Sequence, residues 1–106
     1  MNITRRKPVS VGEILAEEFM QPYNLTQAEL AGLMGVSRKT VNELCTNKRS
    51  ITAETALMLA TVFANTPEFW LNSQQGNDVW HVLNSKQRAM RVHNAKPLPA
   101  WRKRVA

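Results

Sequence analysis

Residues 27–46, QAELAGLMGVSRKTVNELCT, place small, turn-forming and apolar residues where two helices joined by a tight turn require them. Ala31 falls where the two helices would cross closely, and Gly35 can adopt the positive φ that reverses the chain. Val41 and Leu44 lie about one helical turn apart, so they are expected to face the first helix together. The stretch therefore predicts a helix-turn-helix with these four residues at its core.

The chain has 106 residues, of which 43% are hydrophobic. A domain of this size buries roughly 65% of its unfolded surface, which is enough for one core and not for two. The apolar runs end well before the ~20 residues that a membrane span needs. The single cysteine, Cys45, can form no intrachain disulfide, and it fits a reducing compartment as a small packing residue. We therefore expect a cytoplasmic protein without a membrane segment.

Positive charge is concentrated at the C-terminal end. Up to Ser85 there are seven Lys or Arg and eight Asp or Glu, a net charge of −1. From Lys86 onward there are seven basic residues and no acid, which adds +7 and gives the total of +6. Such a concentration favours a polyanionic partner, and a merely solvated surface is the alternative.

Serine and threonine residues stand where helix N-caps are expected. The predicted N-caps are Ser10, Thr26, Ser37, Thr52 and Thr66. Glu13 and Glu29 follow two of them at the spacing of a capping box, and Pro67 suits the first position of the last helix. The pattern predicts five helices, over about 11–21, 27–34, 38–46, 53–63 and 67–90. The expected fold is all-α.

Three regions are expected along the chain. They are a flexible basic arm over residues 1–9, a folded domain over 10–92 and a disordered basic tail over 93–106. The helix at 53–63 should be central, with an apolar face made by Ala56, Leu57, Leu59, Ala60 and Phe63. Gly76 weakens the helix at 67–90 by about 1 kcal/mol relative to alanine, so a bend or break there is an alternative to one continuous helix.

An α-helix fits the major groove of DNA, where each base pair shows its own pattern of donors and acceptors. The helix after Gly35 is therefore predicted to read DNA. Its first residues would meet the bases: Ser37, Arg38, Lys39, Thr40 and Asn42. Phosphate contacts are expected on both sides of it, from Thr26, Gln27, Asn47, Lys48 and Arg49. Glu43 has two interpretations: it accepts from a cytosine amino group, or it pairs with Lys39 along the helix.

A symmetric homodimer is expected, because one helix-turn-helix reads only a few base pairs. The candidate interface is an apolar set in the last helix: Trp70, Val79, Trp80 and Leu83. In the alternative interpretation these side chains complete the core of the monomer.

The sequence resembles the HigA/VapI antitoxins, a family within the Xre and lambda-repressor-like group. Three stretches carry the resemblance: KPVSVGEILAEEFMQP at 7–22, the helix-turn-helix itself, and RSITAETALMLATVFANTPEFWLNSQ at 49–74. It implies a five-helix lambda-repressor-like domain and a cytoplasmic homodimer. It also implies that the dimer represses its own promoter at a palindromic operator and neutralises a HigB/RelE-like mRNA endonuclease toxin. After WLN the chain departs from the family pattern, with SQQGND at 73–78.

A toxin that cleaves RNA is expected to be basic, and like charges across an interface reduce affinity. The first helix carries outward acidic residues, Glu13, Glu17 and Glu18, so it is the predicted toxin-binding face. The alternative is that these glutamates are only solvated.

No enzymatic pattern stands out. The chain has no H-E-x-x-H or C-x-x-C motif, and His81 and His93 are isolated, so we expect no catalytic residue, metal or cofactor. Two other functions remain open. The protein could be a stand-alone Xre-type transcriptional repressor without a toxin partner, or a purely protein-binding helical module.

Overall fold

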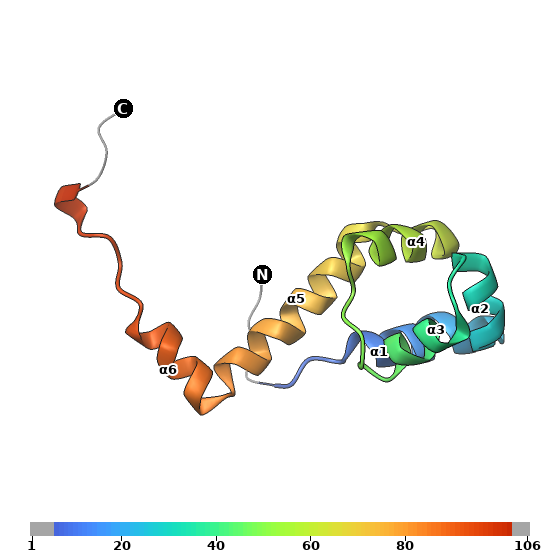
Figure 1. The fold of residues 1–106 in the computed structure, drawn as a ribbon, viewed down its shortest axis with the longest axis horizontal. Helices are drawn as coiled ribbons and strands as arrows, with labels where there is room; N and C mark the ends of the chain where they lie inside the picture. Colours follow the sequence, from blue (N-terminus) through green and yellow to red (C-terminus); the bar gives the residue numbers. More distant parts are fainter. Residues whose placement is uncertain (1–5, 103–106) are drawn as a thin grey trace.

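Helices α2, Gln27–Met34, and α3, Arg38–Cys45, lie side by side at one end of the molecule (Figure 1). The computed structural model describes residues 6–102, and over that range the chain forms helices and loops and no strand. The all-α fold predicted from the sequence is therefore confirmed.

The predicted N-caps are confirmed, and each sets the first residue of its helix. The side-chain oxygens of all five accept a backbone N–H three residues further on. Thr26 forms the full capping box, because the Glu29 carboxylate also accepts the Thr26 N–H at 3.1 Å. Helices α4, Ala53–Phe63, and α5, Pro67–Leu83, begin where Thr52 and Thr66 predict.

The first helical segment is not the single α-helix that the sequence predicts. It begins as α1, Val11–Glu13, continues with π-helical winding over Ile14–Met20, and ends as a 3₁₀ turn over Gln21–Tyr23. Pro22 has no N–H to donate and its ring disfavours regular α-helical winding before it. Leu15 and Met20 still reach the core from this segment.

Aromatic side chains form one part of the core, where the first helical segment, α4 and α5 meet. Trp70 is fully buried, and its ring centroid lies 4.8 Å from that of Phe19 and 6.0 Å from that of Phe63. Its indole N–H donates to Asn65 Oδ1 at 3.0 Å, which satisfies the one polar group of the ring. The expectation for Leu57 is wrong: α4 turns it outward, and 58% of it is exposed.

Helix α5 runs unbroken through Gly76, because its polar middle is bonded to other parts of the chain. Asn77 is buried, and its amide donates to the backbone oxygens of Val9 and Ser73, each at 3.0 Å. Gln74 Oε1 accepts the backbone N–H of Ile51 at 3.1 Å. The polar stretch therefore holds the N-terminal arm and the loop before α4 against α5.

The predicted helix at 67–90 is two helices, α5 and α6, Lys86–Asn94. Asn84 ends α5 with its side chain on the Trp80 carbonyl at 2.8 Å, and Ser85 caps α6. Helix α6 contacts α5 and buries none of its residues, and a short 3₁₀ turn follows at Ala100–Arg102. The helix also crosses the predicted domain boundary at residue 92. In Figure 1, α6 and the segment after it extend away from the other helices.

Candidate nucleic-acid interface

The crossing of α2 and α3 fixes the direction of α3. Ala31, Val41 and Leu44 are 5%, 0% and 2% exposed and lie in the main hydrophobic core. Gly35 has φ +76°, and the N–H groups of Gly35 and Val36 both donate to the Ala31 carbonyl, at 2.9 and 3.0 Å. This left-handed residue ends α2 and turns the chain into α3 within three residues.

The N-terminal end of α3 presents its polar side chains outward. Ser37 Oγ accepts the Thr40 N–H at 3.2 Å and lies 3.0 Å from Thr40 Oγ1, so these two residues are occupied at the cap. Arg38, Lys39 and Asn42 are exposed. Neither basic residue forms an ion pair with another residue of the described range. Their donors are therefore available to a ligand.

Two predicted DNA contacts from different helices are brought together. Asn42 Nδ2 in α3 donates to Oε1 of Gln27, the first residue of α2, at 3.3 Å. This contact occupies one of the amide hydrogens of Asn42. The other amide hydrogen and Oδ1 remain available. The edge of an adenine can accept a hydrogen bond from this amide hydrogen and donate one to Oδ1.

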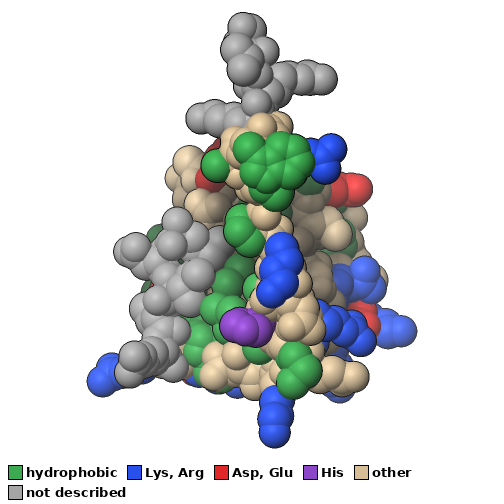
Figure 2. All heavy atoms as spheres, turned by 90° about the vertical axis from the view of Figure 1, so that its left-hand side faces the viewer, with side chains coloured by type: hydrophobic (Ala, Val, Ile, Leu, Met, Phe, Trp, Pro, Cys, Tyr) green, Lys and Arg blue, Asp and Glu red, His purple; other side chains and the backbone are tan. Residues whose placement is uncertain are grey.

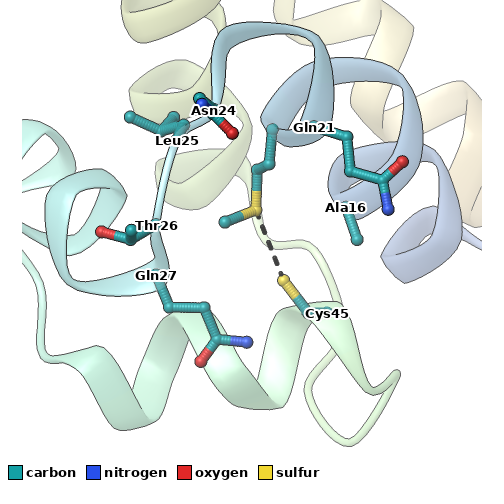
Figure 3. A pocket seen from close by; sticks show the side chains of 8 residues that line it. Ala16, Gln21, Asn24, Leu25, Thr26, Gln27 and Cys45 are labelled. Atoms are coloured by element: carbon teal, nitrogen blue, oxygen red, sulfur yellow. Dashed lines mark hydrogen bonds between the residues drawn. The ribbon is translucent and has the colours of Figure 1, made fainter.

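A hollow of about 330 Å³ lies beside the start of α2 (Figure 3). Its lining comes from the first helical segment, the turn before α2 and the end of α3: Ala16, Met20, Gln21, Asn24, Leu25, Thr26, Gln27 and Cys45. The first N–H groups of α2 have no partner within the helix, and such groups favour anions. Cys45 Sγ lies 3.7 Å from Met20 Sδ, and burial raises the pKa of its thiol, so Cys45 stays protonated and packs as a small residue.

Asn47 lies where a phosphate contact is predicted, but the structure gives it an internal role. Its Oδ1 accepts the Gly12 N–H at 2.9 Å and its Nδ2 donates to Ser10 Oγ at 3.0 Å. The residue has φ +60°, a conformation that asparagine tolerates after a helix. An asparagine directly after a predicted helix was the sequence signal that could have indicated this structural role. Asn47 therefore joins the loop after α3 to the start of α1.

The same junction explains why residue 12 is glycine. A Cβ on Gly12 would lie 2.4 Å from the backbone oxygen of Cys45 and 2.8 Å from Oδ1 of Asn47. Helix α1 can approach the end of α3 only without a side chain there. No local pattern in the sequence indicated this contact, because its partners are more than thirty residues apart.

Arg49, a predicted phosphate contact, forms an ion pair with Glu43 within the protein. Arg49 Nη2 lies 2.9 Å from Glu43 Oε1. This hydrogen bond lowers the pKa of Glu43. Lys39, one of the two partners suggested for Glu43, forms no ion pair with it in the described range and only adds a coulombic contribution that lowers the pKa of Glu43. Lys48 is the exposed cation of this loop without an ion pair in the described range.

The residues predicted for the dimer interface and for the toxin-binding face differ in their exposure. Trp70 is wrong as a dimer contact, because the monomer already encloses it. Val79 and Trp80 are half-buried on α5, and Leu83 is 43% exposed. The acidic residues Glu13, Glu17 and Glu18 are all exposed, and Glu13 also accepts a hydrogen bond from Ser10 Oγ at 3.1 Å.

The described residues offer neither a membrane-spanning helix nor a cluster of metal ligands. Within residues 6–102 no helix combines the length and apolar character that crossing a bilayer demands. In the same range no group of three or more His, Cys, Asp or Glu side chains is placed to hold a metal ion.

Two short helices crossing at Ala31, turned by Gly35 and exposing polar side chains at the start of the second, define a helix-turn-helix protein. Residues 17–71 match the family model described as helix-turn-helix (HTH_3). The chain is 46% identical to antitoxin HigA-1 of Vibrio cholerae over 92% of its own length and 90% of the relative's. It is also 46% identical to an uncharacterised HTH-type transcriptional regulator of Haemophilus influenzae, over 87% and 86%.

Among solved structures, the Pseudomonas aeruginosa antitoxin HigA with the higBA promoter superimposes with a TM-score of 0.77 at 30% identity, over 87% of this chain and 99% of that one. The chain belongs to the HigA family of helix-turn-helix antitoxins.

Proposed function

We propose that the protein is the antitoxin of a type II toxin-antitoxin module. As a homodimer in the cytoplasm it binds a palindromic operator in its own promoter and represses its operon, and it neutralises a HigB/RelE-like mRNA endonuclease. The observation that carries the DNA-binding part is the outward N-terminal end of α3, with Asn42 held by Gln27. A HigA relative of the same fold is described with the higBA promoter, which supports this assignment.

Base reading falls to the exposed side chains at the start of α3. Arg38 can donate two hydrogen bonds to guanine, and Asn42 can bind adenine in the same bidentate way, each discriminating by ~1–3 kcal/mol. Lys39 reaches the same groove as a point charge. Ser37 and Thr40 already bond to each other, so they contribute through the hydrogen-bonding capacity that remains to them.

Phosphates bind on either side of this helix. At the start of α2, the capping box occupies the N–H groups of Thr26 and Glu29, and the N–H groups of the first helical residues beside Gln27 have no partner within the helix, so they stabilise an anion. After α3, Lys48 is the principal cation, because Arg49 is shared with Glu43 and Asn47 is engaged with α1. These contacts set the register of the protein on the duplex, and they do not select sequence.

Dimerisation uses the part of α5 that the monomer leaves incompletely covered. Val79, Trp80 and Leu83 lie within five residues of one another there, and two-fold pairing would place the same patch of each chain against its copy. Such a pair presents two α3 helices to half-sites about one helical turn apart.

The toxin binds the acidic face of the first helical segment. Glu17 and Glu18 are exposed, and Glu13 adds a third carboxylate at the start of the segment. A basic RNA-cleaving partner is attracted to this face and repelled by the C-terminal end of the chain.

A stand-alone Xre-type repressor is the second candidate. Two relatives, from H. influenzae and Escherichia coli, are described as HTH-type transcriptional regulators, without mention of a toxin. The genomic neighbourhood separates the two functions: a small RelE-like reading frame beside this gene supports the antitoxin, and its absence supports the plain repressor.

The experiment that tests DNA reading compares Arg38→Ala/Asn42→Ala with wild type on DNA from upstream of its own gene, in competition with shuffled sequence. The double variant should keep its helical circular dichroism and lose its preference for the promoter. Asn72→Ala/Gln75→Ala, on the exposed side of α5, is the matched control and should keep that preference. A folded double variant with undiminished preference would overturn the proposal.

A further inference from the structure

The C-terminal arm, residues 86–102, carries basic side chains and no acid. Its described basic residues are all exposed: Lys86, Arg88, Arg91, Lys96 and Arg102. None forms an ion pair within residues 6–102. The arm therefore concentrates positive charge that the rest of the described protein does not neutralise.

Helix α6 holds part of this charge on a defined scaffold. Ser85 caps it by accepting the Arg88 N–H at 3.5 Å, and none of its residues is buried. Arg88 and Arg91 are three residues apart and share one face, whereas Lys86 lies on the other side of the helix. Positive charge thus surrounds the helix.

The apolar residues of α6 do not form a continuous stripe. Met90 and Val92 are both exposed, and residues two positions apart in a helix point about 160° away from each other. The small Ala89 lies between them around the helix, but Lys86 projects on that same side and interrupts it. A helix that lies on a bilayer or in an apolar groove needs one continuous apolar face. The arrangement fits an extended polyanion better than either of those partners.

The arm is also remote from the reading helix. The molecule is 57 Å long, with α2 and α3 towards one end and α6 towards the other (Figure 1). This exceeds the ~34 Å of one DNA turn. Figure 2, which views the arm end of the molecule, shows Lys and Arg side chains spread over that face and interleaved with hydrophobic ones.

We propose that residues 86–102 bind the phosphate backbone of duplex DNA, outside the bases that α3 of the same chain reads. The inference rests on the proposed function only in that α3 brings the protein to a duplex. The contact is independent of sequence. It extends the footprint of each subunit and raises the salt dependence of binding, because each neutralised phosphate releases condensed counterions.

The test measures salt dependence on random-sequence DNA, so it does not depend on base reading. The variant is Lys86→Gln/Arg88→Gln/Arg91→Gln, which removes three charges and keeps good helix formers. The matched control is Met90→Gln/Val92→Gln, which alters the same helix without changing its charge. Binding is followed by fluorescence anisotropy over a series of NaCl concentrations, on one duplex of about four helical turns and on another of about one turn.

On the long duplex the log–log salt slope of the triple variant should be shallower than that of wild type by about 2.7, at 0.9 for each lost phosphate contact. The control should keep the wild-type slope. The short duplex cannot lie under both α3 and the arm of one chain, so on it the slopes of wild type and triple variant should differ by less than on the long duplex.

An unchanged slope on the long duplex would overturn the proposal, as would the absence of wild-type binding to it. Binding to anionic phosphatidylglycerol vesicles is measured as well. If wild type binds the vesicles, the triple variant does not, and the DNA salt slope is unchanged, the arm binds a lipid surface instead. If the arm does not bind phosphate, the promoter preference conferred by α3 is unaffected. If α3 does not read bases, the slope difference between wild type and triple variant is unaffected. The two proposals can therefore be contradicted separately.

Discussion

Asn42 Nδ2 and Gln27 Oε1 lie 3.3 Å apart, and this hydrogen bond joins the first turn of α2 to the exposed face of α3. It restricts the rotamers of Asn42 before any ligand arrives, which reduces the entropy lost on binding. We therefore expect Gln27 to contribute to promoter binding in two ways, by its own contact with phosphate and by orienting Asn42.

This relationship predicts coupling between the two residues. Gln27→Ala and Asn42→Ala should each weaken promoter binding, and the double variant should lose less than their sum by about 1 kcal/mol, because the residues are in contact. A double-mutant cycle of promoter affinities measures that difference. Losses that add within experimental error would show that Gln27 does not orient Asn42.

Glycines 12 and 32 predict opposite effects of alanine. Gly12→Ala places a methyl group against the Cys45 carbonyl and should lower the free energy of unfolding by about 1–3 kcal/mol. Gly32 is exposed in α2 with no neighbouring atom within 4 Å of an added Cβ, so Gly32→Ala should raise stability by roughly 0.5–1 kcal/mol. Urea denaturation of both variants tests the pair, and equal effects would contradict the close approach of α1 to α3.

Asn47 and Lys48 are neighbours with different predicted roles. Asn47→Ala leaves the Gly12 N–H without its partner and should cost about 1–3 kcal/mol of stability, with no change in the salt slope of DNA binding. Lys48→Ala should do the reverse, with unchanged stability and a slope shallower by about 0.9. Thermal melts and salt titrations of both variants distinguish the roles. The assignment of Asn47 would be wrong if its loss flattened the salt slope.

The ion pair of Glu43 predicts a direction of titration. Hydrogen bonding from Arg49 holds the pKa of Glu43 below its ordinary value of 4.5, so the folded carboxyl binds a proton less readily than the unfolded one. The stabilisation is therefore present above the unfolded pKa and is lost as the pH falls through the folded pKa. Arg49→Gln should raise the pKa of Glu43 towards 4.5, as measured by NMR titration of its side-chain carboxyl carbon. No upward movement would contradict the pairing in solution.

The acidic face predicts a separation of function. Charge reversal of Glu13, Glu17 and Glu18 to lysine should abolish neutralisation of the cognate toxin in a growth-rescue assay, because it replaces attraction with repulsion. Promoter binding should remain, since this face is distinct from the start of α3. Glu54→Lys/Glu68→Lys, two exposed acids elsewhere, is the charge control and should still neutralise. Neutralisation by the triple variant would remove this face as the toxin site.

Local sequence determined the helix starts and the turn, because each depends on hydrogen bonds among residues three or four positions apart. The Ser37 hydroxyl accepts the Thr40 N–H three residues further on, and the Gly35 N–H donates to the Ala31 carbonyl four residues back. Both contacts lie within a short stretch of the sequence. The charge of the C-terminal arm is likewise a property of the sequence alone.

Tertiary structure decided the contacts between distant segments. Asn47 reaches Gly12 across 35 residues and Asn77 reaches Val9 across 68, so neither side chain could be assigned a partner before the helices were packed. The burial of Trp70 depends in the same way on Phe19 and Phe63 arriving from two other helical segments. A polar or aromatic side chain has many partners compatible with its chemistry, and only the packed backbone determines which of them lies within reach.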